Sequence, residues 1–519
     1  MNIDTDVLVV GYGPVGQTLA ALLAGAGHRV DVYERFSCLY DLPRAVYFDD
    51  EIMQVWQSLG IAGDLDVLPI NTYEWFGADG DTILRMEHPK LGPSGWEPGY
   101  LFYQPTLERA LDRRVRSLPT ATVHCGWSAE SLEQFDDYVE VTLRRVREPR
   151  VGELEPTDET TTVRARYVIG ADGANSVVRA AAGIALDDLG FAEPWLVVDL
   201  RPDDIDALSS IPAPCQWCDP VRPHMHTRNG RSHRRFEFML LPGERPEDFA
   251  DEARVWSLLA PWFTPDDGTL VRQAVYEFRG RLATTMRADR ALLAGDAAHT
   301  MPPFMGQGLC SGVRDAVNVA WRLDLILRGV ADAGLLDGYT TERRAQNEWI
   351  VNLSTEMGRV SCTLDARAAA DRDAALRAAE VPPTLGLPPL ADGTLATGRP
   401  LAGHRAVQGV VRIDRREGRF DDVFAKHFTL LTRHAPQLSP AHVEFLDRLG
   451  AHVIALHQLE DLDGRLTAWF DAHRIEAVVV RPDAYVFGAV AWPDEIPALL
   501  DDLLSHLPTI DSRITADVR

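Results

Sequence analysis

The chain has 519 residues, of which 46% are hydrophobic, and its formal net charge at pH 7 is −25. Its length exceeds that of one ordinary domain, so two or three domains are expected. A chain this acidic repels phosphate backbones and anionic lipid surfaces, which argues against nucleic-acid binding and membrane attachment.

The cysteines are sparse, six in 519 residues, and this suits a reducing cytoplasm. The N-terminus has no secretory pattern. No stretch reaches the roughly 18 continuous apolar residues that indicate a spanning helix. Cys215 and Cys218 form a CxxC pair with no second pair nearby, so neither a metal site nor a redox pair is expected there. We expect a cytoplasmic protein without a bound metal.

The N-terminal segment predicts one βαβ unit of a parallel sheet. The apolar run Val7–Val10 is typical of a buried strand, Val15–Ala26 has helical character, and Val30–Tyr33 has the composition of a second strand. Gly27 lies between the helix and the second strand, where it stops the helix.

The turn between the first strand and the helix has the pattern GxGxxG, formed by Gly11, Gly13 and Gly16. The first glycine permits a tight turn, the second lets the backbone approach a pyrophosphate, and the third allows close packing of helix and strand. The helix N-terminus offers unpaired N–H groups to phosphates. Glu34 ends the second strand, where its carboxylate can accept hydrogen bonds from an adenosine ribose. The alternative is a tight turn followed by a surface glutamate.

The composition then changes along the chain. The stretch from about Tyr73 to Gly99 is rich in glycine, proline and tryptophan and predicts a departure from the nucleotide-binding unit. Residues 184–284 are rich in strand-forming residues and predict a separate antiparallel sheet. A proline-rich link near Val381 precedes a C-terminal segment in which helical and strand patterns alternate.

A second glycine motif, GDAAHTMPPFMGQG, follows an apolar strand. Asp296 stands at the end of that strand, where a carboxylate needs a polar partner such as a ribityl hydroxyl. Gly306 and Gly308 bring backbone N–H groups to the start of a helix, whose N-terminus would stabilise negative charge on a reduced flavin ring. The alternative is an acidic helix cap followed by a glycine loop. Together with the first motif, this one indicates a flavin enzyme.

A third motif, GADGANSVVR, contains Asp172 and Arg179. Over about residues 5–360, the three motifs resemble, in order, the glycine fingerprint, the Asp-Gly motif and the Gly-Asp motif of the single-component FAD-dependent aromatic hydroxylases (group A flavoprotein monooxygenases). The segments LPRAVYFDDEIM, GYLFYQPTLERAL and HRRFEFMLLPGE are most similar to the 3-(3-hydroxyphenyl)propionate hydroxylase and polyketide hydroxylase branch.

The resemblance implies an α/β fold with three parts. A Rossmann-like FAD-binding domain of the glutathione-reductase type is expected at residues 1–75, 100–183 and 284–380, and a β-sheet substrate domain at 76–99 and 184–283. Residues 390–519 resemble the thioredoxin-like domain of many such hydroxylases. No cysteine lies beyond Cys362, so we expect packing or dimerisation from that domain rather than dithiol chemistry, and a homodimer is one expected assembly.

The resemblance also implies which residues hold FAD. The residues expected at the ADP half and the pyrophosphate are Gly11, Gly13, Pro14, Val15, Gly16, Glu34, Arg35 and Arg44. Those expected at the ribityl chain, the ring or both nucleotides are Gln104, Asp172, Asp296, Pro303, Gly306, Gly308 and Leu309. Many relatives have asparagine where this chain has Cys310, which removes a side-chain amide beside the ring.

The implied function is the hydroxylation of a phenolic or other aromatic substrate, dependent on NADPH or NADH and on O2, through a flavin C4a-hydroperoxide. The implied substrate is a hydroxyphenyl acid or an aromatic polyketide. Alternatives are a flavin-dependent dehydrogenase or saturase, Baeyer–Villiger oxygenation of a polycyclic polyketide, and a non-enzymatic escort protein on the same scaffold.

A base that deprotonates the phenol would assist such a reaction. His224 and His226, on the β-rich segment expected to form the substrate floor, are the candidates, and surface or core histidines are the alternative. Arg222, Arg234 and Arg235 are candidates for binding a substrate carboxylate, with solvated strand charges as the alternative.

Overall fold

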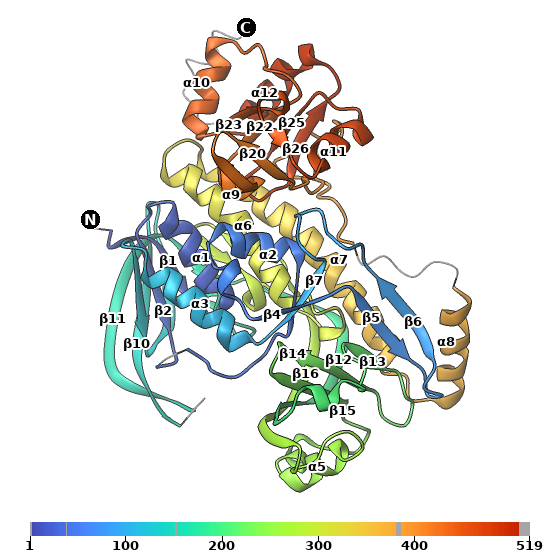
Figure 1. The fold of residues 1–519 in the computed structure, drawn as a ribbon. Coiled ribbons are helices and arrows are strands. Elements are labelled where there is room, and N and C mark those ends of the chain that lie inside the picture. Colours follow the sequence, from blue (N-terminus) through green and yellow to red (C-terminus); the bar gives the residue numbers. More distant parts are fainter. Residues whose placement is uncertain (1–2, 38, 151–152, 380–385, 508–519) are drawn as a thin grey trace.

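The computed structural model describes residues 3–37, 39–150, 153–379 and 386–507 (Figure 1). Cys38 and the start of the proline-rich link fall outside these ranges. Within them, none of the helices combines the length and apolarity needed to cross a membrane.

The first unit is an eight-stranded sheet around the N-terminal βαβ motif. Its path is β17 (Arg287–Ala288), β18 (Ala291–Leu293), β11 (Glu153–Gly170), β1 (Thr5–Val10), β2 (Val30–Glu34) and β8 (Ala121–Cys125), with β10 (Val139–Arg150) and β9 (Trp127–Gln134) branching from β11. β1 pairs in parallel with both β11 and β2. The predicted strand–helix–strand unit is thus confirmed as β1, α1 (Pro14–Gly25) and β2.

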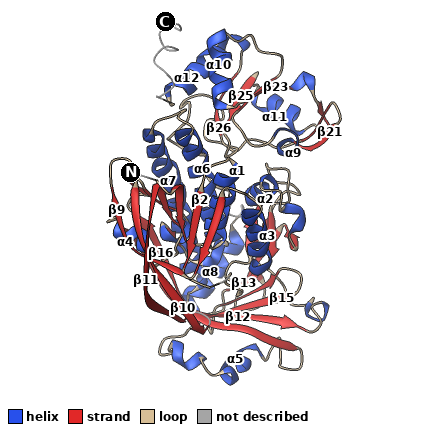
Figure 2. Ribbon diagram, turned by 90° about the vertical axis from the view of Figure 1, so that its left-hand side faces the viewer, coloured by secondary structure: helices blue, strands red, loops and turns tan. Residues whose placement is uncertain are grey.

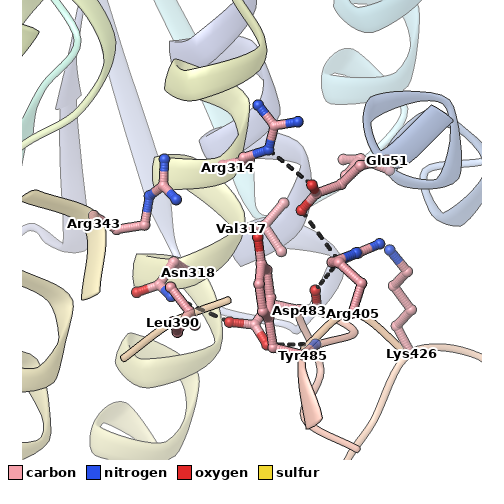
Figure 3. Close-up of a pocket in the computed structure, with 11 residues that line it drawn as sticks. Glu51, Arg314, Val317, Asn318, Arg343, Leu390, Arg405, Lys426, Asp483 and Tyr485 are labelled. Carbon is pink, nitrogen blue, oxygen red and sulfur yellow. Dashed lines mark hydrogen bonds and ion pairs between the residues drawn. The ribbon is translucent and has the colours of Figure 1, made fainter. Parts of the chain in front are cut away.

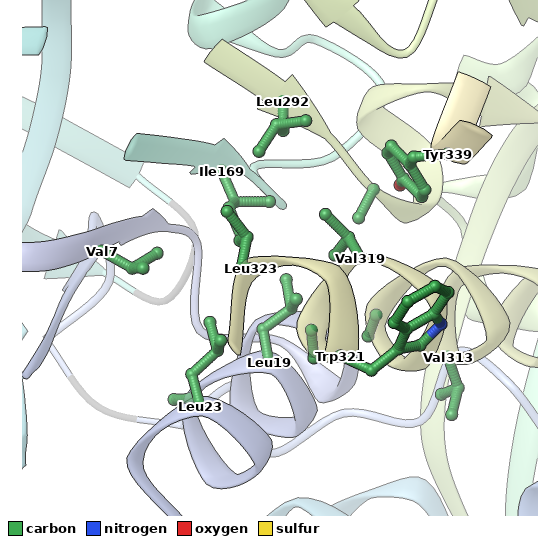
Figure 4. Close-up of a cluster of buried hydrophobic side chains, with 14 of the residues drawn as sticks. Val7, Leu19, Leu23, Ile169, Leu292, Val313, Val319, Trp321, Leu323 and Tyr339 are labelled. Atoms are coloured by element: carbon green, nitrogen blue, oxygen red, sulfur yellow. The ribbon is translucent and has the colours of Figure 1, made fainter. Parts of the chain in front are cut away.

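Helices cover this sheet and bury its apolar side chains. The main ones are α1, α3 (Gln104–Arg116), α6 (Gly308–Leu327) and α7 (Asp337–Ser361). Figure 4 shows Leu19 of α1 and Leu323 of α6 packed toward Ile169 of β11, and all three are fully buried. Each such side chain contributes about 1.5–3 kcal/mol by leaving water. The core therefore fixes α1 and α6, whose N-termini carry the two glycine motifs, against the same sheet.

The second unit is an eight-stranded sheet that confirms the predicted β-rich region (Figure 2). Its order is β19 (His299–Thr300), β16 (Gly268–Ala283), β12 (Leu186–Pro202), β15 (His233–Met239), β14 (His224–Asn229), β13 (Cys215–Trp217), β5 (Thr72–Phe76) and β6 (Thr82–Glu87). Its neighbouring strands are antiparallel except for β13 and β5, which pair in parallel. α5 (Glu252–Leu259) packs its apolar residues against one face, in a core that includes Leu196, Val198 and Phe236. The opposite face of the central strands lines a cavity that residues of the first unit also border.

Smaller elements join the two units. A three-stranded sheet runs β3 (Tyr47–Asp49), β7 (Gly99–Phe102) and β4 (Val67–Ile70). The remaining helices of this part are α2 (Asp50–Ser58), α4 (Val177–Ala181) and α8 (Ala366–Ala378), and α8 packs beside β6 (Figure 1).

The C-terminal unit is a separate α/β domain, as predicted (Figure 1). Its four-stranded sheet has the order β23 (His452–Ala455), β22 (Thr429–Thr432), β25 (Ala477–Val480) and β26 (Val486–Val490), and its three-stranded sheet the order β21 (Arg416–Arg419), β20 (Val410–Ile413) and β24 (Glu460–Asp461). Its helices are α9 (Phe420–Phe424), α10 (Pro440–Leu449), α11 (Arg465–His473) and α12 (Ile496–Ser505).

Buried charges join this unit to the rest of the chain. Arg481 is fully buried, and its Nη atoms donate to both carboxylate oxygens of Glu342 on α7, at 2.8 and 2.7 Å, and to Asp483. A second chain of charges runs from Arg314 of α6 through Glu51 of α2, at 2.8 Å, to Arg405, at 3.1 Å (Figure 3). Because each charge has a partner, their burial is tolerated.

We expect Arg481→Met to destabilise the protein by about 3–5 kcal/mol, because Glu342 and Asp483 would lose a cation that is buried with them. Differential scanning calorimetry or fluorescence-monitored thermal unfolding measures the change. Arg412→Met is the matched control, because Arg412 pairs with Glu417 and Glu460 on the surface of the same unit. Equal melting temperatures for the two variants would contradict a structural role for Arg481.

Candidate active site

A cavity of about 440 Å³ lies where the carboxyl ends of the first sheet meet the inner face of the second sheet. Ligands of open α/β sheets bind beyond the carboxyl ends of the strands. All but one of the residues predicted to hold FAD line this cavity. They are Gly11, Gly13, Pro14, Val15, Glu34, Arg35, Arg44, Gln104, Asp172, Asp296, Pro303, Gly306, Gly308 and Leu309. Sequence segments far apart in the chain therefore meet around one space.

The exception, Gly16, lies behind the wall of the cavity. A Cβ atom on Gly16 would stand 2.0 Å from the carbonyl oxygen of Gly11, so only glycine lets α1 approach β1 this closely. Gly11 has φ +102° and the space for its Cβ is taken by the Ala171 carbonyl, at 2.3 Å. Gly13 has no atom within 4 Å of its Cβ position, and its open side faces the cavity.

Two carboxylates are fixed at the cavity wall by backbone N–H groups. Glu34 accepts hydrogen bonds from the N–H groups of Tyr12, at 2.6 Å, and Phe36, at 3.0 Å. Asp172 uses its Oδ2 to accept from Val177, at 2.7 Å, and Val178, at 3.2 Å. Its Oδ1 is buried and has no partner in the described part of the chain. A buried acceptor in this state suits a hydroxyl donor such as a ribose or ribityl group.

The second glycine motif forms the opposite wall. Gly306 has φ +64° and a Cβ there would stand 2.8 Å from the ring of Tyr47, so the turn and the aromatic ring are in close contact. α6 begins at Gly308, and its N-terminus lines the cavity with free backbone N–H groups. Asp296 follows β18, as predicted, and its side chain also lines the cavity.

These residues fit FAD. The open side of Gly13 accommodates a pyrophosphate, the unpartnered Asp172 oxygen accepts from a hydroxyl, and the N-terminus of α6 offers positive potential to a ring that becomes anionic on reduction.

Gln104 lines the cavity but its amide already has protein partners. Its Oε1 accepts from the backbone N–H groups of Arg44, at 3.1 Å, and Ala45, at 2.6 Å, and its Nε2 donates to Glu108 at 2.5 Å. Burial raises the pKa of Glu108 to about 7, opposed by the Gln104 hydrogen bond. Gln104 therefore shapes the loop that carries Arg44, and Glu108 is a cavity residue that the sequence did not reveal.

A row of three charged residues crosses the floor of the cavity. Strand pairing places Asp199 of β12 beside Arg235 of β15 and Arg272 of β16. Arg235 donates to both carboxylate oxygens of Asp199, at 2.7 and 2.9 Å. The two arginines also donate to the Pro43 carbonyl, and Arg235 to that of Arg44 at 2.5 Å. This row holds the loop at residues 43–45 against the floor.

The next row along the strands carries a carboxyl group. Glu237 pairs with Val197 across β15 and β12, and both line the cavity together with Met225, Tyr276 and Phe278. Sequence reasoning missed these residues. The available signal was the alternation in RRFEFM, where Arg235 and Glu237 share a face and Phe236 and Phe238 share the other.

The prediction that His224 and His226 act on the substrate does not agree with their positions. Both lie on the face of β14 opposite to Met225, because successive strand residues point to opposite faces. His226 lies among Phe236 and Trp262, with ring centroids 4.6 Å away in both cases. Burial lowers the pKa of both histidines, so they are neutral packing residues.

The three arginines predicted to bind a substrate carboxylate also differ in their positions. Arg235 lines the cavity, as stated above. Arg222 makes a two-point ion pair with Glu244, at 2.9 and 2.8 Å, outside the cavity lining. Arg234 points to the α5 side of the sheet and donates to the Leu208 carbonyl at 2.6 Å. Neither Arg222 nor Arg234 is placed to bind a substrate carboxylate.

Two protein families match the chain. Residues 4–354 match the family described as FAD binding domain, and residues 403–506 match the family described as HcaD C-terminal domain.

Curated proteins and solved structures resemble the whole chain. It is 39% identical to a probable NADH-specific resorcinol 4-hydroxylase of Rhodococcus jostii (strain RHA1), over 98% of this chain and 96% of that protein. It is 33% identical to a 3-(3-hydroxy-phenyl)propionate/3-hydroxycinnamic acid hydroxylase of Mycolicibacterium smegmatis, over 93% of this chain and 90% of that protein. The crystal structure of the flavin-dependent monooxygenase PieE with FAD and substrate has the same fold, with a TM-score of 0.82, 23% identity and coverage of 98% of this chain and 100% of that one.

We expect Gly13→Ala to fold normally but to lose FAD, because the new methyl group enters the open side of the turn where the pyrophosphate would lie. Overpacking of this kind costs about 1–3 kcal/mol, a roughly tenfold to hundredfold weaker affinity. The ratio of bound FAD to protein, measured by absorbance after purification, checks this. Gly25→Ala, at the far end of the same helix and also with free space around its Cβ position, should keep its FAD. Full FAD content in Gly13→Ala would contradict the assigned role.

Proposed function

This chain belongs to the FAD-dependent aromatic hydroxylases, and on that premise we propose that it hydroxylates a small phenol such as resorcinol, with NADH as the reductant and O2 as the oxygen source. The proposal for the substrate and for NADH draws on the resorcinol hydroxylase relative, which is similar over nearly the full length of both chains. The observation that carries the proposal is that the residues suited to FAD and an aromatic-lined floor border the same cavity.

When bound, FAD supplies hydride acceptance and oxygen activation, and the protein supplies binding, orientation and electrostatics. Gly13, Asp172 and Glu34 suit the nucleotide and sugar end, and the N-terminus of α6 suits the ring. Val197, Met225 and the two aromatic residues of β16 line the floor with apolar surface, which excludes water from the reacting face.

The proposed reaction uses a nicotinamide cofactor, in keeping with the cytoplasmic location that we propose from the sequence. We also retain the homodimer as a proposal, for which light scattering after size-exclusion chromatography is the test.

We expect purified FAD-loaded protein to oxidise NADH slowly alone and about tenfold or more faster with resorcinol, with equal consumption of NADH and O2. Mass spectrometry after reaction under ¹⁸O2 should find one labelled oxygen in the product. The Gly13→Ala protein serves as a FAD-poor control, and unlabelled gas in ¹⁸O-water controls for exchange. A product without label would favour a dehydrogenase, and the absence of stimulation by any phenol would refute the proposal.

A further inference from the structure

Glu237 places a buried carboxyl group on the cavity floor. Glu237 is only 4% exposed, yet its side chain lines the cavity. Within the described residues, no group donates a hydrogen bond to its oxygens, and the nearest cation is the Nη1 of Arg235, 3.7 Å from Oε1. Buried polar atoms are normally hydrogen-bonded. A buried carboxyl left without a donor beside an open cavity is therefore suited to a ligand that brings one.

The neighbouring Arg235 does not donate a hydrogen bond to this carboxyl group, because its donors are used elsewhere. The Nε and Nη2 atoms of Arg235 donate to Asp199, and Nη1 and Nη2 donate to the carbonyls of Arg44 and Pro43. Its guanidinium is committed to the row that holds the 43–45 loop. A substrate carboxylate would have to displace these bonds, whereas a substrate hydroxyl can donate to Glu237 without disturbing them.

The surroundings of Glu237 raise the pKa of its carboxyl group to near neutral pH. Burial raises the pKa of Glu237 to about 7, with Arg235 opposing the rise and Asp199 adding to it. Tyr73 of β5 also lies near, and burial raises the pKa of its phenol, so that it adds no charge. A base works best when its pKa lies near the working pH.

We propose that Glu237 binds the hydroxyl group of the phenolic substrate and accepts its proton. This inference deepens the proposed function and rests on it for the identity of the substrate. In the step, the phenol O–H bond breaks, a Glu237 O–H bond forms, and the electron pair stays on the phenolate oxygen. Electron density then rises at the ring carbons ortho and para to that oxygen, where an oxygen atom is received. The proton returns from Glu237 to the oxygen of the product.

A proton acceptor at Glu237 restricts the substrate to aromatic rings with a free hydroxyl group. The ring must carry a free hydroxyl that donates to Glu237, so aryl ethers of the same shape should be poor substrates. Resorcinol and 1,3-dimethoxybenzene form a matched pair of probes for this requirement, because they differ in the hydroxyl protons and two methyl groups.

The test compares wild type, Glu237→Gln and Glu237→Asp as FAD-loaded proteins between pH 6 and pH 8.5. In wild type, kcat/KM for resorcinol should rise with pH through about 7, because the ionised carboxylate is the acceptor. Glu237→Gln should lower kcat about 10²-fold and abolish this rise, since the amide is a poor proton acceptor. Glu237→Asp should keep the rise at a reduced kcat. Glu277→Gln, an exposed member of an ion pair on β16 outside the cavity lining, is the matched control and should behave as wild type.

Binding, measured by calorimetry, separates this inference from the proposed function. Resorcinol should bind wild type more tightly at pH 8 than at pH 6 and bind Glu237→Gln equally at both, while 1,3-dimethoxybenzene should show no pH dependence in either protein. A pH dependence that persists in Glu237→Gln overturns the inference and leaves the proposed function standing. A phenol that neither binds nor stimulates NADH oxidation refutes both.

Thermal unfolding tests whether the Glu237→Gln variant is folded as stably as wild type. The pKa of Glu237 is raised in the folded protein, so the stability linked to its protonation is lost as pH rises through about 7. Glu237→Gln cannot ionise and should be at least as stable as wild type at pH 8. If it were instead much less stable there, the carboxylate would be structural and the inference would fail.

Discussion

The buried ion pair between Arg235 and Asp199 joins the two halves of the active site. Asp199 is fully buried and accepts from Arg235 at two points and from Asn229 at 3.1 Å. The same guanidinium reaches the carbonyls of Pro43 and Arg44, which belong to the nucleotide-binding unit. A buried charge without its partner is strongly destabilising. The floor sheet and the loop before β3 are therefore held in one arrangement, and the cavity between them has a defined shape.

The carboxylates in and beside this cavity differ in their hydrogen-bond partners. Glu34 and Asp172 accept hydrogen bonds from backbone N–H groups, which hold these side chains at the cavity wall. Asp199 forms a two-point ion pair with Arg235. Glu237 has neither kind of partner at hydrogen-bonding distance, so burial dominates and leaves it able to exchange a proton near neutral pH. Position within the hydrogen-bond network, rather than residue type, distinguishes these carboxylates.

The C-terminal unit is tied to the catalytic part by charges as well as by apolar packing. Arg481 and Arg405 reach carboxylates on α7 and α2, and Arg314 links α2 to α6, whose N-terminus lines the cavity. Among the described residues this unit contains no cysteine. Its contacts are those of a domain that braces the helices behind the active site.

The sequence by itself determined the nucleotide-binding half of the site. Glycine motifs, buried strands and helix starts are local features: the φ of +102° at Gly11 and the contact of Gly16 with the Gly11 carbonyl both lie within one βαβ turn. The substrate floor was decided only by the tertiary structure. Both faces of β14 and β15 are buried, one against α5 and one against the cavity, so apolar alternation does not say which face meets the ligand. His224 and His226 have suitable chemistry but contact Trp262, just after α5, whereas Glu237 faces the cavity. The deciding information is the docking of two sheets through contacts between residues far apart in the chain.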